Sequence, residues 1–214
     1  MSVNLISISS NAEKLMGFIA RVSNPANQFN DNVAGLLAFC IREGHWSVFE
    51  HAHMTLEITT TRDIGAQMLR HRSFFFQEFS QRYAAVMNPA RVPELRLQDH
   101  KNRQNSLEVL DEESKLIVAD FEKRIAQQFA ETQDLYNDML DAGIAKECAR
   151  KVLPLNTETK IYMTGNVRQW IHYITLRSGN GTQKEHMLIA QQAKEVFTNE
   201  LPIVAKALGW TSEA

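Results

Sequence analysis

The sequence lacks most features that mark a secreted, membrane-bound or metal-binding protein. Its only cysteines, Cys40 and Cys148, are far apart and form no CxxC pair, so neither a disulfide framework nor a zinc site is expected. No apolar run reaches the roughly 18 residues of a membrane span, and the first residues lack the basic flank and apolar run of a signal peptide. We therefore expect a soluble cytoplasmic protein, in the host cytoplasm if the source is a virus, with no membrane partner.

The chain also lacks a basic excess. Its formal net charge is −2, whereas dedicated nucleic-acid-binding domains are usually basic. A nucleic-acid-binding module built on Arg70, Arg72, Arg82 and residues 100–105 is an alternative. We nevertheless expect no nucleic-acid partner, and we expect any anion site to be a local group of arginines. The 214 residues suit one domain spanning 1–214, which is long enough to bury a core without disulfides or metals.

Hydrophobic spacing predicts a mixture of strands and helices. Strands are predicted at 3–8, 50–60 and 159–164, and alternation in the second places Ala52, Met54, Leu56 and Ile58 on one face. Loops are predicted at 23–32 and 84–107, and a turn at 178–182. Helices are predicted at 11–21 with Asn11 as its cap, then at 33–44, 63–71, 111–142, 144–153, 166–177 and around 187–197.

Three of these helices carry apolar residues that we expect to be buried. The helix at 33–44 places Cys40 on an apolar stripe, so this cysteine is expected in the core. The helix that Asn166 opens has one apolar side and a second side with Arg168, His172 and Thr175. The residues expected to be buried are Val167, Trp170, Ile171 and Ile174 in that helix, and Leu116, Phe121, Ile125, Phe129, Leu135 and Met139 in the helix at 111–142.

The stretch RHRSFFFQEFSQRY, residues 70–83, combines basic, acidic and aromatic side chains. The arginines at 70 and 72 follow a helix end, where the helix dipole alone could explain them. Glu78, Ser80 and Arg82 occupy alternate positions, so an extended segment would present all three on one face. An arginine fork there suits a phosphate, and a carboxylate suits a ribose hydroxyl. The phenylalanines at 74, 75, 76 and 79 either pack in the core or stack on a planar ring.

Two further groups of polar residues have open interpretations. In GHWSVFEH, residues 44–51, Glu50 and His51 together with His53 could hold a metal, but no third strong ligand has matching spacing, so no metal is expected. Arg150 and Arg177 lie on separate predicted elements. Arg177 could simply close its helix, or the two could join other basic groups in an anion site if the fold brings them together.

The segments together resemble the flavin-dependent thymidylate synthase family. Arg70, His71, Arg72 and Ser80 fit its signature of Arg-His-Arg, seven residues, then Ser. ARVSNP at 20–25, GHWSVFEH at 44–51, AKECARKVLPL at 145–155 and GNVRQWIHYITLR at 165–177 occur in the family's order. The resemblance covers residues 5–208. It implies an α+β fold, a twisted, mostly antiparallel sheet flanked by helices.

The resemblance also implies an activity. In this family dUMP is methylated to dTMP, methylenetetrahydrofolate supplies the carbon, and NADPH-reduced FAD supplies the reducing equivalents. The family is homotetrameric, with active sites shared between subunits. No enzyme nucleophile is expected, because Cys40 lies on a core stripe, Cys148 is expected to be structural, and Ser80 has no evident activating His–Asp pair. A flavin- or nucleotide-binding relative that has lost the reaction is a further alternative.

By resemblance, each site residue has an expected role. Arg177 would lie at the uracil edge and favour ionisation at N3, Arg150 would come from a neighbouring chain, and His45 would lie near flavin and folate. The position of His172 is Asn in some relatives, and Gly181 stands where relatives have a flavin-contacting histidine. The loop around 98–106 could be a lid or a folate contact. Expected dUMP contacts are Gln67, Arg70, Glu78, Phe79, Ser80, Gln81, Arg82, Arg150 and Arg177; expected FAD contacts are Ser47, Arg70, His71, Arg72, Glu78, Asn166, Arg168 and His172.

Overall fold

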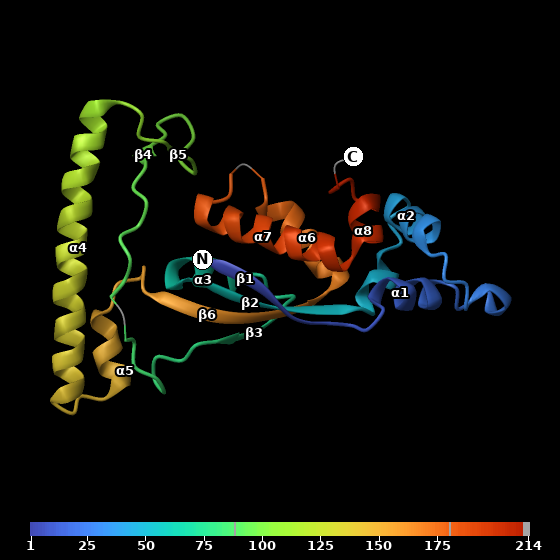
Figure 1. Cartoon of the computed structure of the whole chain (residues 1–214), viewed down its shortest axis with the longest axis horizontal. Helices are drawn as coiled ribbons and strands as arrows, with labels where there is room; N and C mark the ends of the chain where they lie inside the picture. The colour runs from blue at the N-terminus through green and yellow to red at the C-terminus, as the bar shows by residue number, and fades with distance from the viewer. Residues whose placement is uncertain (88, 180, 212–214) are drawn as a thin grey trace.

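The structure is a computed structural model that describes residues 1–87, 89–179 and 181–211. Its central sheet has the strand order β1 (Ser2–Ile8), β2 (His53–Thr61), β6 (Glu158–Asn166) and β3 (Phe75–Glu78). Every neighbouring pair in this sheet is antiparallel. A small second sheet pairs β4 (Leu97–Gln98) with β5 (Ser106–Leu107) away from the first (Figure 1). The expected antiparallel α+β architecture is confirmed.

Eight α-helices and three short 3-10 helices surround this sheet in the described part of the chain. Near the sheet lie α3 (Arg62–Met68), α6 (Val167–Arg177) and α7 (Lys184–Glu200), and Figure 1 shows α6 and α7 over one face. The other α-helices are α1 (Ala12–Ala20), α2 (Ala34–Arg42), α4 (Glu112–Asp141), α5 (Lys146–Ala149) and α8 (Pro202–Ala207), and the 3-10 helices are η1 (Pro25–Asn27), η2 (Trp46–Glu50) and η3 (Arg150–Val152).

The core lies between the sheet and helices α6 and α7. Alternate residues of β2 point into it, and Met54, Leu56 and Ile58 are fully or almost fully buried, as the alternation predicts. Trp170 of α6 is completely buried, and its indole N–H donates to the backbone oxygen of Met54 at 2.9 Å. This hydrogen bond satisfies the one polar atom of a large core side chain. It therefore fixes the position of α6 on the sheet.

The helix α6 begins as its sequence predicts. The Asn166 side chain accepts a hydrogen bond from the backbone N–H of Gln169, and the Gln169 side chain accepts from the backbone N–H of Asn166. This reciprocal capping box satisfies two backbone donors at the first turn. The predicted apolar stripe is confirmed, since Val167, Trp170, Ile171 and Ile174 are all buried.

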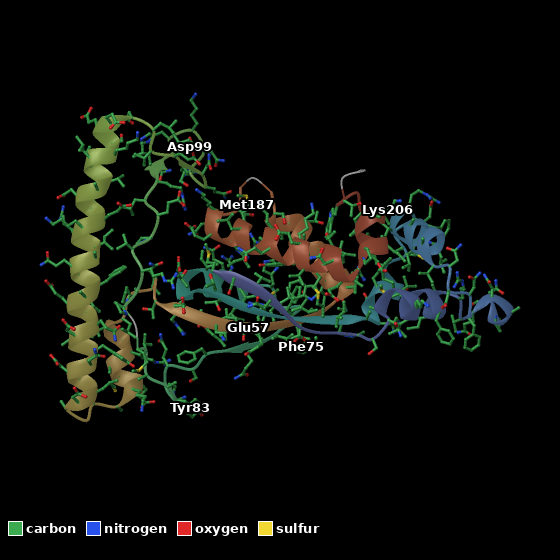
Figure 2. The ribbon with its side chains drawn as sticks, viewed as in Figure 1. Glu57, Phe75, Tyr83, Asp99, Met187 and Lys206 are labelled. Carbon is green, nitrogen blue, oxygen red and sulfur yellow. The ribbon has the colours of Figure 1, made fainter. Side chains whose placement is uncertain are left out.

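Helix α4 departs from its predicted role. It stands beside the rest of the molecule, and its side chains project outward along its length (Figures 1 and 2). The elements that it contacts most are the short α5 and η3. The prediction that Leu116, Phe121 and Leu135 point into the core is wrong, because their exposed fractions are 74%, 46% and 51%. The spacing of apolar residues along α4 therefore does not show whether this chain itself buries them.

Smaller differences occur near both ends of the chain. Cys40 is buried, as predicted. Asn11 precedes α1 in a left-handed conformation (φ 50°) and makes no side-chain cap, so its predicted capping role is wrong. The helix predicted around 187–197 is confirmed as part of α7, whereas α8, which starts at Pro202 after α7 ends at Glu200, was not predicted. Within the described residues, no helix combines the length and the apolar character needed to cross a membrane.

Candidate active site

The turn after α3 is held in place by one buried aromatic side chain. Helix α3 ends at Met68, and Arg70, His71 and Arg72 follow in a tight turn in which the His71 backbone N–H donates to Met68 O at 2.9 Å. The ring of Phe74 then packs edge-on against Trp170 of α6, with centroids 4.9 Å apart. Phe74 therefore anchors the turn to the core. His71 is consequently half-buried, while Arg70 and Arg72 are exposed.

His71 is hydrogen-bonded to Arg177, which lies more than a hundred residues away in sequence. Arg177 is the last residue of α6, and its Nε donates to His71 Nε2 at 3.0 Å. Burial, then the charges of Arg177 and His172, lower the pKa of His71 to about 4. A neutral His71 has the lone pair that this bond requires. This hydrogen bond therefore fixes the orientation of the Arg177 guanidinium at its Nε edge.

Gln67 belongs to the same cluster through a residue that the sequence analysis did not single out. The Gln67 Oε1 lies 3.3 Å from His186 Nδ1, and His186 Nε2 lies 3.1 Å from the hydroxyl of Tyr173. Both His186 and Tyr173 are completely buried. His186 lies on the buried stripe of α7 with Ile189 and other apolar residues. A histidine within an apolar helical stripe was the signal that could have identified it.

A cavity lies along the other side of α6. Its volume is about 770 Å³, and its lining includes Asn166, Arg168, His172 and Thr175. The prediction that Arg168, His172 and Thr175 share one side of their helix is confirmed by this common lining. The N-terminus of α6 also opens here, where a helix favours anionic groups. The cavity and the His71 turn are neighbours, because Ser73, two residues after His71, also lines the cavity.

The segment GHWSVFEH supplies another part of this cavity. Trp46 and Glu50 line it, and the guanidinium of Arg168 is paired with the carboxylate of Glu50. Ser47 is exposed on η2 between those two lining residues, and His45 immediately precedes η2 with its ring edge-on to Phe39. Glu50 is thus already paired with a guanidinium, which disfavours the metal interpretation of this segment.

Glu78 lies at the end of β3, against α3. Its Oε1 accepts from the Thr159 hydroxyl at 2.9 Å and lies 3.3 Å from Arg62 Nη1. Gly65 of α3 lies close to the same strands, since a Cβ there would lie 3.1 Å from the Ile161 side chain, a tight contact, and 3.7 Å from Glu78 Oε1, an ordinary one. The carboxylate is thus positioned by three elements and lies on the same side of the sheet as the Gln67 helix.

The predicted alternation after Glu78 is wrong beyond Ser80. The chain does not stay extended, because the backbone N–H groups of Tyr83 and Ala84 both donate to Ser80 O and form a turn. Gln81 is buried, whereas Arg82 is exposed and lies 3.4 Å from Glu147 of α5. Glu78, Ser80 and Arg82 therefore do not present one strand face. Tyr83, labelled in Figure 2, projects from this turn at the same end of the molecule as α5.

The aromatic residues of the same stretch divide between the core and the surface. Phe74 is buried and Phe76 is packed against the core, as the core-packing interpretation predicts. Phe75 and Phe79 are exposed by 75% and 39%, so that interpretation is wrong for them. Arg150 lies where α5 passes into η3 and is half-buried. The predicted turn at 178–182 includes residue 180, which lies outside the described residues.

Comparisons with known proteins identify the family to which the chain belongs. Residues 4–203 match the family described as "Thymidylate synthase complementing protein". A "Probable flavin-dependent thymidylate synthase" of Paramecium bursaria Chlorella virus 1 is 53% identical over 98% of this chain and 100% of its own length. A "Flavin-dependent thymidylate synthase" of Synechocystis is 54% identical over 92% of this chain and 90% of its own length.

A solved structure has the same fold. The "UMP/dUMP methylase PolB" from Streptomyces cacaoi, bound with 5-Br dUMP, superposes with a TM-score of 0.80 at 26% identity and covers 97% of this chain and 94% of its own. The match to the family extends over nearly all of the chain and includes every segment of the site. This chain belongs to the flavin-dependent thymidylate synthase family.

Proposed function

We propose that this protein, acting as one domain of 214 residues in the cytoplasm, methylates dUMP to dTMP. Methylenetetrahydrofolate would supply the carbon and NADPH the reducing equivalents, with FAD as cofactor. The family membership supports this proposal, as do two relatives at 53% and 54% identity that are named flavin-dependent thymidylate synthases. The similar solved methylase holds a bromo-dUMP, which supports a nucleotide of that class as substrate.

The bond between Arg177 and His71 is the observation that carries the proposal. Its donor is a permanently charged guanidinium, and its acceptor is a neutral imidazole nitrogen. A guanidinium held in this way at the uracil edge would stabilise negative charge as it develops at N3 and O4. Such preorganised stabilisation lowers the barrier without reorganisation at the moment of reaction. Negative charge on the ring makes C5 nucleophilic, so no enzyme nucleophile is required.

The turn at 80–83 supplies groups suited to the sugar and phosphate of the nucleotide. Arg82 is exposed and can offer a bidentate fork to phosphate oxygens. The buried Nε2 of Gln81 has no hydrogen-bond partner within the described residues. A buried amide donor is destabilising unless something accepts from it, so a bound ligand is expected to meet it. Glu78, fixed by Thr159 and Arg62, would accept from a sugar hydroxyl.

The cavity along α6 fits the proposed flavin. Arg168 and the N-terminus of α6 would attract the anionic diphosphate, and His172 and Asn166 would add hydrogen-bonding groups. Trp46, Glu50 and Ser73 line the same cavity. Ser47, Arg70 and Arg72, which lie close to these residues in sequence, would complete the contacts. Bound FAD would supply the reducing equivalents for the carbon that is transferred. The protein side chains would orient the two ligands and exclude water between them.

We further propose that the protein acts as a homotetramer with shared active sites. The exposed apolar residues of α4, among them Leu116, Ile117 and Phe121, are suited to burial against another copy of the chain. Arg150 would reach the nucleotide of a neighbouring copy. In that arrangement each site would combine the Arg177 cluster of one chain with groups from another.

The first experiment combines an absorbance spectrum with a turnover assay. Purified protein should show flavin absorbance bands, and it should release tritium from C5-tritiated dUMP when methylenetetrahydrofolate and NADPH are both present. A colourless protein that also fails to take up added FAD would contradict the proposal. Flavin-loaded protein that releases no tritium would favour the relative that has lost the reaction, whereas steeply salt-dependent RNA or DNA binding would favour the nucleic-acid module.

A further inference from the structure

A chain of hydrogen bonds crosses the site from helix α6 to the start of α7. Tyr173 contacts His186, His186 contacts Gln67, and Gln67 Nε2 lies 2.7 Å from Gln183 Oε1. The chain continues from Gln183 Nε2 to Glu185 Oε2 at 3.0 Å. Its inner end is completely buried, and its outer end reaches the surface. Only Gln67 among these residues has an expected contact with the nucleotide.

Glu185 determines which group donates and which accepts in every hydrogen bond of this series. Burial alone would raise the pKa of Glu185, but hydrogen bonds from its own backbone, Arg96 and Gln183 lower it, and Arg96 Nη2 lies 2.8 Å from its other oxygen. The ionised carboxylate can only accept. Gln183 must therefore turn its NH₂ group toward Glu185 and its oxygen toward Gln67, so Gln67 must donate to Gln183 through its own NH₂ group.

The orientation of the Gln67 amide in turn fixes the tautomer of His186. Because the NH₂ group of Gln67 faces Gln183, its carbonyl oxygen faces His186 Nδ1, and Nδ1 must carry the proton. His186 Nε2 is then the acceptor of the Tyr173 hydroxyl. Burial, then the charges of Arg177 and His71, lower the pKa of His186 to about 4. The imidazole therefore stays neutral near pH 7, as its acceptor role requires.

We propose that His186 is a positioning residue for nucleotide binding, whose Nδ1–H holds the Gln67 carbonyl inward so that the Gln67 NH₂ group is presented to the substrate. This inference rests on the proposed function, in which Gln67 contacts dUMP. An amide NH₂ group has two hydrogens, and Gln183 takes one. The other suits an acceptor, such as a uracil carbonyl oxygen. Without the His186 donor, the Gln67 carbonyl would lose its hydrogen-bond partner, so the amide would be held only at its contact with Gln183 and could swing about that contact, away from the substrate.

Two amide substitutions separate this role from simple core packing. In His186→Asn the side-chain nitrogen occupies the place of Nδ1, so the donor to Gln67 is kept and the contact with Tyr173 is lost. In His186→Gln the amide reaches the place of Nε2, so the Tyr173 contact is kept and the donor to Gln67 is lost. If His186 only fills space, glutamine, which is closer to histidine in size, should be tolerated at least as well as asparagine.

The measurement is the dissociation constant of dUMP, determined by calorimetry on the FAD-loaded protein, with the melting temperature of each variant as control. We expect His186→Gln to weaken dUMP binding by about tenfold, the effect of one lost hydrogen bond that leaves a polar group unpaired. His186→Asn should stay within about threefold of the wild type. The double variant Gln67→Ala/His186→Gln should bind no more weakly than Gln67→Ala alone, because His186 acts through Gln67.

Other results would overturn the inference. Asparagine and glutamine variants of equal affinity, or a glutamine variant that binds better, would refute the positioning role while leaving the proposed function intact. A wild-type protein that binds no dUMP would refute the proposed function itself. Long-range ¹H–¹⁵N spectra of the histidine rings give a test without dUMP: the Nδ1–H tautomer of His186 is expected at pH 7, and the Nε2–H tautomer would contradict the proposal.

Discussion

The two halves of the candidate site differ in how complete they are within one chain. The inner half consists of Gln67, His71, Tyr173, Arg177 and His186. Each of these side chains is hydrogen-bonded to another member of the group, and Tyr173 and His186 are completely buried. The outer half, the turn at 80–83 with Arg150 and α4, is largely exposed, and the Arg82 side chain of that turn lies 3.4 Å from Glu147 with both side chains exposed. A single chain therefore preorganises the Arg177 cluster, whereas under the proposed assembly a neighbouring chain would complete the outer contacts of the nucleotide.

Removal of the Arg177 guanidinium should abolish the catalytic function of the inner half. Arg177→Ala should lower turnover by about a hundredfold or more, because the group that stabilises charge on the uracil ring is lost. The melting temperature should change little, since Arg177 is only partly buried at a helix end. Arg177→Lys is the matched control and should recover little activity, since an ammonium cannot reproduce the planar fork. Wild-type turnover in Arg177→Ala would refute its role.

A charge introduced on α4 should disrupt the proposed contact of the outer half with another chain, without affecting the inner half. Leu116 is 74% exposed in the chain, so Leu116→Glu should leave folding and the cluster around Arg177 unchanged. It should nevertheless dissociate the tetramer and lower turnover by about tenfold, because a charge in an apolar interface is destabilising. Light scattering measures the assembly. Lys123→Glu, at an exposed position of the same helix, should remain tetrameric; a tetrameric Leu116→Glu would contradict the proposed interface.

The inner half should also be sensitive to acid. Because His186 has a pKa of about 4 in the folded chain and 6.5 ordinarily, the unfolded state takes up a proton first as the pH falls. The contribution of neutral His186 to the free energy of unfolding is thus fully present above about pH 6.5 and is lost as the pH falls toward 4. Between pH 7 and 5.5, His186 alone should contribute a loss of about 1 kcal/mol.

Urea unfolding at the two pH values measures this effect, with His186→Asn as comparison. His71, also lowered to about 4, should add a smaller loss because it is partly exposed. The variant should show a shallower dependence on pH than the wild type. Equal pH dependence in both proteins would contradict a buried neutral His186.

The smallest expected effect is at the outer ion pair. Glu147→Gln removes the exposed partner of Arg82 and should change the free energy of unfolding by less than about 0.5 kcal/mol. If Arg82 binds the phosphate, removal of this competing carboxylate should leave dUMP affinity equal or slightly higher. Urea unfolding and a dUMP titration test both statements. A loss of stability well above 1 kcal/mol would show that this region is more tightly organised than its exposure indicates.

Local sequence patterns predicted the parts of the fold where one face meets the core. The alternation of β2, the start of α6 at Asn166 and the stripe of α6 were all predicted, and so was the common side of Arg168 and His172. In each case the physical signal is periodic burial or a side chain within reach of its own backbone. Such signals need no knowledge of the rest of the fold.

Other parts of the structure depend on contacts that no local pattern encodes. The spacing of Glu78, Ser80 and Arg82 suits a strand, but hydrogen bonds to Ser80 O form a turn there. The apolar spacing of α4 does not say whether the chain itself or another copy covers it. His186 was overlooked because its partners, Gln67 and Tyr173, come from two other helices. The pairing of Arg177 with His71 likewise required the fold.

A complementation assay tests most directly the central claim that one active site joins the inner half of one chain to Arg150 of another. Arg177→Ala and Arg150→Ala should each be nearly inactive in tritium release from C5-tritiated dUMP. When the two variants are mixed, dissociated and reassembled, some interfaces should combine an intact Arg177 with an intact Arg150, and part of the wild-type turnover should return. Reassembled mixed tetramers that remain as inactive as either variant alone would contradict the account.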